Sequence, residues 1–190
     1  MIDRHIRGHR TIAIVAAALA LVALVAVAGC GRHDRTAPAT TTSAVPGPAA
    51  PAGVDDRDPD QVLAWVAARV YSWRPGEDSS PAASFDRARP LLDPVYIRQV
   101  GASAAGLANV TGGTWARWRA DKAVVSATAR VTGDDHPADT PTSRQRVVAI
   151  AQHVTDPAAP SEPDRMLVAY MIVTRQTGTD RWRVSMVAPR

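Results

Sequence analysis

The chain has 190 residues, a formal net charge of +4 and a single cysteine. One cysteine allows no intrachain disulfide, and the basic residues are almost all arginines, spread along the chain rather than clustered. We therefore expect neither a disulfide scaffold nor a basic stripe that binds nucleic acid.

The first 30 residues have the layout of an export signal. Arg4, Arg7 and Arg10 precede an uncharged, apolar run over residues 11–29, as in secretory signals. The last four residues, VAGC, resemble a bacterial lipobox, in which Cys30 is diacylated and becomes the first residue of the mature protein. An uncleaved transmembrane helix is the main alternative, because about 25 Å of apolar helix is only slightly shorter than the ~30 Å hydrocarbon core; release as a secreted protein is the third. The lipoprotein and the spanning helix predict the same topology: the arginines stay in the cytoplasm, and the residues after Cys30 lie outside, at the cell membrane.

Residues 31–54 consist mainly of Ala, Pro, Thr, Ser and Gly. Such a segment buries too little apolar surface to offset the loss of chain entropy, so we expect a disordered linker. Residues 55–190 are then one extracytoplasmic domain, which is long enough for a single hydrophobic core.

The domain opens with helical periodicity. Apolar residues recur at steps of three and four from Val62 onward, and Asp58 followed by Pro59 is typical of a helix N-terminus. Trp65 and Trp73 are expected to pack toward a sheet, and the Pro-Gly pair at residues 75–76 to end the helical region.

Residues 89–94, RPLLDP, predict a hinge between two short helices, the second of which begins at residues 93–94 and ends near Gly101. Residues 102–113 are small and Gly-rich, and we expect an irregular connection there. Trp115 and Trp118 precede the first strand. If the segment is extended, these two side chains turn to opposite sides and one of them is exposed beside Arg117 and Arg119, as in an interface anchor; packing of both in the core is favoured.

Four strands are expected over residues 123–131, 144–154, 166–175 and 181–187, because apolar and polar residues alternate there and polar loops separate the runs. The third run, MLVAYMIVT, is apolar on both faces, which favours an internal strand. The order predicts an α+β fold in which N-terminal helices pack on one face of a curved, four-stranded antiparallel sheet whose other face is solvated.

His153 is the histidine best placed for chemistry. It shares its strand face with alanines and a valine, so it is expected on the core side, where a base would need an acidic partner within hydrogen-bond reach. The spacing selects none of the candidate partners Asp86, Asp93 and Asp121, and a structural or strand-end surface histidine is favoured over a catalytic base.

No metal or cofactor site is expected. Residues 134–139, DDHPAD, could in principle hold a divalent cation, but they lack the ligand spacing of zinc and calcium sites, and a solvated hairpin loop is favoured. The sequence also lacks the GxSxG, GxxxxGK[ST] and GxGxxG motifs.

The order of a Trp-bearing helix with WRPG, a Pro-interrupted helix with RPLL, four strands and a terminal WRV resembles the nuclear-transport-factor-two-like cone fold. More narrowly, it is similar to membrane-anchored actinobacterial proteins of conjugative elements and mammalian-cell-entry operons. The resemblance spans residues 55–189. It implies a scaffold role in an envelope complex, such as the core of a type IV secretion system in conjugation, and it brings no catalytic residues.

Two functions follow from these patterns. The favoured one is a non-catalytic, membrane-tethered interaction module with protein partners in an envelope complex, and homo-oligomerisation stays open. The alternative is a small-molecule binding protein or enzyme that uses a cavity of the cone fold. The residues expected to line a pocket or an interface are Trp65, Trp73, Tyr96, Trp115, Trp118, His153 and Trp182.

Overall fold

The computed structural model describes residues 49–159 and 163–190, so the expected signal or anchor and most of the linker lie outside the described residues. The helical elements are α1 (Pro59–Val70), α2 (Ala83–Ala88), η1 (Arg89–Leu91), α3 (Pro94–Val100), η2 (Gly101–Ala108) and α4 (Gly112–Ala120). The strands are β1 (Val124–Val131), β2 (Ser143–Thr155), β3 (Arg165–Thr174) and β4 (Arg183–Pro189). Among the described helices, none is long and apolar enough to cross a membrane.

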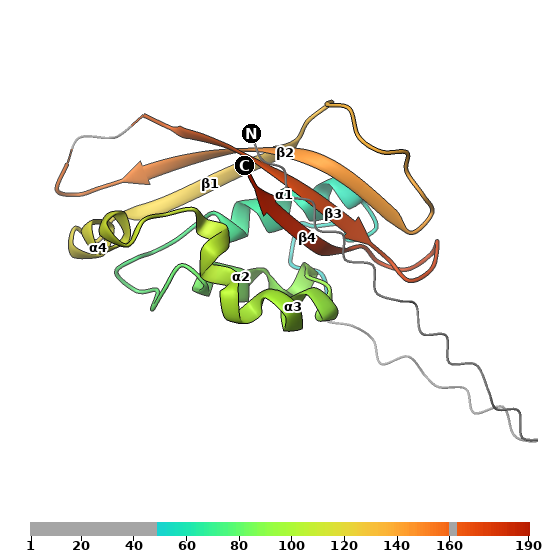
Figure 1. The fold of residues 1–190 in the computed structure, drawn as a ribbon, viewed down its shortest axis with the longest axis horizontal. Helices are drawn as coiled ribbons and strands as arrows, with labels where there is room; N and C mark the ends of the chain where they lie inside the picture. Colours follow the sequence, from blue (N-terminus) through green and yellow to red (C-terminus); the bar gives the residue numbers. More distant parts are fainter. Residues whose placement is uncertain (1–48, 160–162) are drawn as a thin grey trace, which may run out of the picture. The chain divides into compact units, whose positions relative to one another are not determined.

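The predicted α+β class is confirmed. The four strands form one antiparallel sheet in the order β1-β2-β3-β4, so β3 is internal, as its two apolar faces predicted. The helices lie together on one side of this sheet (Figure 1). We call the covered side the inner face and the opposite side the outer face.

Two Asp-Pro pairs begin helices, as the sequence predicted. Asp58 accepts hydrogen bonds from the backbone N–H groups of Asp60 and Gln61 at the start of α1. Asp93 does the same for the second and third residues of α3. In each case the side-chain oxygen satisfies N–H groups that have no partner within the helix, and the proline needs none.

Residues that follow the helices pair with both edges of the sheet. Trp73 exchanges two backbone hydrogen bonds with Val125 on β1, at 2.8 and 2.9 Å, and the Ser72 hydroxyl accepts the Ala127 N–H at 2.9 Å. At the other edge the Asp93 N–H donates to the Val184 carbonyl of β4 at 2.8 Å. These contacts satisfy polar groups that an open edge would present to other chains.

Aromatic side chains fill the space between the helices and the inner face. Trp73 stacks on Trp118 with 6.4 Å between ring centroids, and Tyr71 and Trp115 meet the same indole edge-on. The Trp73 Nε1–H donates to the Ser84 hydroxyl at 2.9 Å, so its polar group is satisfied inside the core.

The segment that holds Trp115 and Trp118 is helix α4, and not the extended run that would have exposed one of the two side chains. Residues three apart lie on the same side of a helix, so both indoles point toward the core; Trp118 is buried and Trp115 partly buried. The Gly-rich connection over residues 102–113 is also more regular than predicted, since η2 occupies most of it and Thr111 caps α4.

The contact of Ser72 with the sheet edge is testable. Ser72→Ala leaves the Ala127 N–H without its partner, and we expect the free energy of unfolding to fall by about 1 kcal/mol in urea titrations. Ser126→Ala on the same strand is the matched control, because the Ser126 hydroxyl is exposed and makes only a 3.5 Å contact. Equal effects of the two substitutions would contradict the role of Ser72.

Candidate functional site

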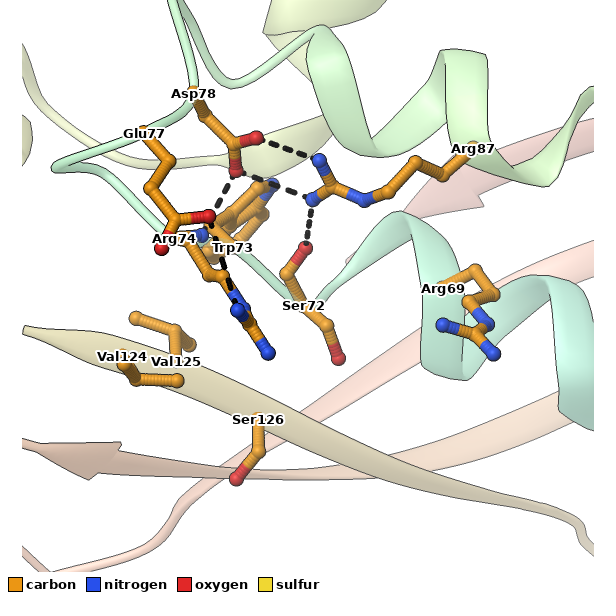
Figure 2. Close-up of a pocket in the computed structure, with 10 residues that line it drawn as sticks. All are labelled: Arg69, Ser72, Trp73, Arg74, Glu77, Asp78, Arg87, Val124, Val125 and Ser126. Carbon is orange, nitrogen blue, oxygen red and sulfur yellow. Dashed lines mark hydrogen bonds and ion pairs between the residues drawn. The ribbon is translucent and has the colours of Figure 1, made fainter.

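Two surfaces of the described domain have the form of a binding site: a polar cleft and the outer face of the sheet. The cleft has a volume of about 430 Å³ and lies between the end of α1, the loop after it and the start of β1 (Figure 2). Its lining residues are Arg69, Ser72, Trp73, Arg74, Glu77, Asp78, Arg87, Val124, Val125 and Ser126.

The buried charge of the cleft is neutralised within the chain. The Arg87 guanidinium crosses from α2 to bind both carboxylate oxygens of Asp78, and it also donates to the Ser72 carbonyl at 2.9 Å (Figure 2). Asp78 additionally accepts the backbone N–H of Arg74 at 2.8 Å. These bonds fix the loop between α1 and α2, so the pair has a structural role.

The other charged side chains of the cleft are exposed. Arg74 and Glu77 form an ion pair at 3.7 Å, and Arg69 lies over the Trp65 ring at 5.2 Å. The Ser72 hydroxyl is engaged by the Ala68 carbonyl and the Ala127 N–H. The described lining therefore offers a nearly neutral polar surface, without a hydroxyl held by a base for nucleophilic chemistry.

The outer face of the sheet is apolar where the sequence predicted a solvated one. Outward positions on β2, β3 and β4 form a continuous surface that we call the apolar patch. Met166 is 68% exposed and Val168 39%, and the remaining members are partly buried. The patch consists of Val147, Ala149, Ala151, Met166, Val168, Tyr170, Ile172, Met186 and Ala188.

The patch ends at strand β1, which carries Ser126, Thr128 and Arg130 on the same face, all exposed. An apolar centre beside a polar rim is the usual anatomy of a protein interface. The described helices all lie on the other side (Figure 1), so they do not cover the patch.

His153 lies on the outer face, so its predicted place on the core side is wrong. The buried residues of β2 are Arg146, Val148, Ile150, Gln152 and Val154, which alternate with the alanine-bearing face. The bulkier, branched side chains of this strand thus meet the helices. The partner of His153 is Asp164, with 2.9 Å between Nδ1 and Oδ1 and both side chains about half exposed.

The three candidate acidic partners of His153 have other roles. Asp86 pairs with Arg89 at 2.8 Å, Asp93 caps α3, and Asp121 ends α4. In the loop before β2, Asp139 binds Arg146 through both oxygens, at 2.7 and 2.8 Å. This guanidinium lowers the pKa of Asp139, and it occupies the position where a cation would have to bind.

The tryptophans and Tyr96 serve the core. Trp73, Trp118 and Trp182 are each 1% exposed, whereas Trp65 and Trp115 are partly buried. The Trp182 ring is flanked by the guanidinium groups of Arg175 at 4.2 Å and Arg144 at 5.6 Å, and the Tyr96 hydroxyl accepts the Val187 N–H at 3.1 Å. The structure brings Trp73, Trp115 and Trp118 together, with Trp182, Tyr96 and His153 in separate surroundings.

The inner core also holds polar atoms that no described group satisfies. Gln152 is fully buried and donates to the Tyr71 carbonyl at 2.7 Å, while its Oε1 has no described partner. The Tyr71 hydroxyl is likewise buried without a partner, and burial raises its pKa to about 12. Such a phenol stays protonated at neutral pH and provides no base.

Sequence reasoning missed the outer face. Two sequence features indicated an apolar outer face. The third strand is apolar on both faces, and the alternating residues Val147, Ala149 and Ala151 are apolar too, but we assigned them to the core. An alternating pattern indicates that one face of a strand is buried. It does not identify that face, because this depends on the side on which the helices pack.

Comparison with protein-family models, with curated proteins and with solved structures finds no match. Functional inference for this chain therefore rests on its own geometry. Among residues 49–159 and 163–190, no group of three or more His, Cys, Asp and Glu side chains is placed to hold a metal ion.

The structural role of the Asp78–Arg87 pair gives a prediction. Asp78→Asn removes a carboxylate whose side chain is 9% exposed, and we expect a loss of about 2 kcal/mol in the free energy of unfolding. The neighbouring Glu77→Gln is the control, because that side chain is 72% exposed and should change stability by less than about 0.5 kcal/mol. Urea titration of both variants measures the difference, and a neutral Asp78→Asn would overturn the structural reading.

Proposed function

We propose that this chain is a membrane-tethered interaction module, which takes part in an envelope assembly through the outer face of its sheet. The apolar patch is the observation that carries the proposal. Apolar surface gains roughly 25 cal/mol per Å² when it leaves water, and Met166 and Val168 are the most exposed members of the patch. A protein partner on this face would bury both.

The export signal supplies the location. Cys30 as a lipidated N-terminus, or residues 11–29 as a spanning helix, would hold the domain on the extracytoplasmic side of the membrane, with residues 31–54 as the linker. The one-sided helical layer is compatible with the cone fold proposed from the sequence. That resemblance favours a non-catalytic scaffold role, with conjugal transfer or secretion as the class of assembly.

The polar cleft supports the alternative, a small-molecule binding protein or enzyme. Its volume suits a small ligand. Its most buried charges already pair with each other, however, and the Arg74–Glu77 pair neutralises a further guanidinium. No described helix covers the exposed apolar patch, and this supports the interaction module over the small-molecule site.

The tether can be tested by mass. We expect the membrane-extracted protein to begin at Cys30 and to carry a diacylglycerol mass that is absent from a Cys30→Ala variant. Intact mass spectrometry of both proteins measures this. An unmodified, full-length mass would rule out lipidation and favour the spanning helix. Recovery of the protein outside the membrane fraction would contradict both kinds of tether.

The binding face can be tested by photo-crosslinking in the intact membrane. A photoreactive residue at Val168 should yield a discrete protein crosslink, whereas the same residue at Gln99, exposed on α3 on the helical side, should not. A second substitution, Ala149→Arg, should abolish the Val168 crosslink because it places a charge in the patch, and Thr128→Arg on the polar rim should leave it unchanged. Crosslinking that is equal at both positions, or insensitive to Ala149→Arg, would refute the proposed surface.

A further inference from the structure

We propose that the occupant of the apolar patch is a second copy of this chain, packed face to face about a two-fold axis. This rests on the proposed function, since it names the partner of the same surface. The shape and the extent of the outer face support a second copy, and its charges provide the test.

The patch consists of a ridge beside a furrow. The outward residues of β3, namely Met166, Val168, Tyr170 and Ile172, are large and form the ridge. On β2, the residues directly beside Met166 and Val168 are Ala151 and Ala149, which leave a furrow one strand wide. Ala188 of β4 likewise lies beside Tyr170.

This surface is complementary to itself. A two-fold axis parallel to the strands, midway between β2 and β3, places β2 of one copy over β3 of the other. Register neighbours then face each other across the interface, so Ala149 meets Val168 of the second copy and Ala151 meets Met166 of the second copy. In these two rows the larger β3 side chain enters the furrow, as in the interdigitated core of a sandwich of two sheets, while Tyr170 meets Val147 of the second copy.

The extent of the face also fits a second sheet. At ~4.8 Å between strands and ~6.8 Å between residues on one side of a strand, the outer face covers roughly 600 Å² in projection. Because side chains protrude from the sheet, the accessible area of this face exceeds its projected area. It therefore approaches the about 800 Å² that each partner buries in a stable interface. A single helix or peptide strand would leave much of the patch in water, whereas a four-stranded sheet covers it.

The proposed axis brings opposite charges together at one place and like charges at another. His153 and Asp164 are neighbours in the continued β2–β3 register, so an imidazole meets a carboxylate across the axis. At the rim, Arg130 beside Ala149 approaches Arg190, whose N–H donates to the Val168 carbonyl and whose guanidinium lies 4.7 Å from the Tyr170 ring. Both arginines are exposed, so water and salt screen their repulsion.

The experiment is sedimentation equilibrium of the full chain in detergent, at several protein and salt concentrations. We expect a monomer–dimer equilibrium that tightens as salt screens the Arg130–Arg190 contact. Val168→Asp should weaken dimerisation about tenfold or more, because burying two carboxylates costs more than a contact with the exposed Arg190 guanidinium returns. Thr128→Asp should leave it unchanged, since Thr128 lies on the exposed polar rim and outside the rows that β4 (Arg183–Pro189) covers.

Arg130→Glu is the decisive variant because it predicts a gain. It replaces two repulsive contacts by two ion pairs, and the dissociation constant should fall roughly threefold to tenfold. A protein that misfolds cannot produce this result, and urea titration of Val168→Asp shows whether that variant remains folded.

Three outcomes would overturn the second copy: a wild-type chain that stays monomeric, a folded Val168→Asp that still dimerises, or an Arg130→Glu that weakens the dimer. The proposed function fails separately. If the chain is monomeric while Val168 still crosslinks to a different envelope protein with the sensitivity stated above, the interaction module stands and its partner is heterologous. If the chain is monomeric and a photoreactive residue at Val168 gives no protein crosslink, both proposals are wrong.

Discussion

The placement of Trp73 is the interaction on which the rest of the domain depends. Its backbone pairs with Val125 at the edge of the sheet, and its indole N–H donates to Ser84 at the start of α2. The Ser84 hydroxyl donates in turn to the Val70 carbonyl at 2.8 Å, at the end of α1. The Trp73 ring stacks on Trp118 of α4. One residue thereby joins three helices to the first strand, and the inner face of the sheet follows from that arrangement.

A sheet of four strands presents two edges and two faces, and the described residues cover the inner face and pair with part of each edge. Residues 72–73 pair with one edge, residues 92–93 with the other, and the helices cover the inner face. Edge pairing saturates backbone groups that would otherwise recruit strands from other chains. Association through the outer face then uses side chains alone, which makes it sensitive to shape and to single charges.

Local signals in the sequence predicted most of the fold. The Asp-Pro pairs at residues 58–59 and 93–94 each begin a helix because capping and a fixed φ act within four residues, and the alternation in each strand run is equally local. Two decisions were not local. Helix α4 forms in a segment with two glycines, since packing of Trp118 against Trp73 outweighs weak helix propensity. The side of β2 that faces the helices depends on side-chain volume across the whole layer, so His153 was assigned to the wrong face.

The arginine-rich composition acquires a physical explanation from the same arrangement. Asp56 is 3% exposed and receives Arg181 through two contacts of 3.0 Å, with Arg183 at 3.4 Å. Asp78 and Asp139 hold Arg87 and Arg146 in the same bidentate manner. A planar guanidinium can satisfy both oxygens of a carboxylate that is removed from water, which an ammonium group cannot do as well. Several of the positive charges are thus engaged with buried or partly buried carboxylates, and the residues of the apolar patch are themselves uncharged. Because that surface lacks charge, a single aspartate or glutamate placed on it or at its rim changes association far more than it changes folding.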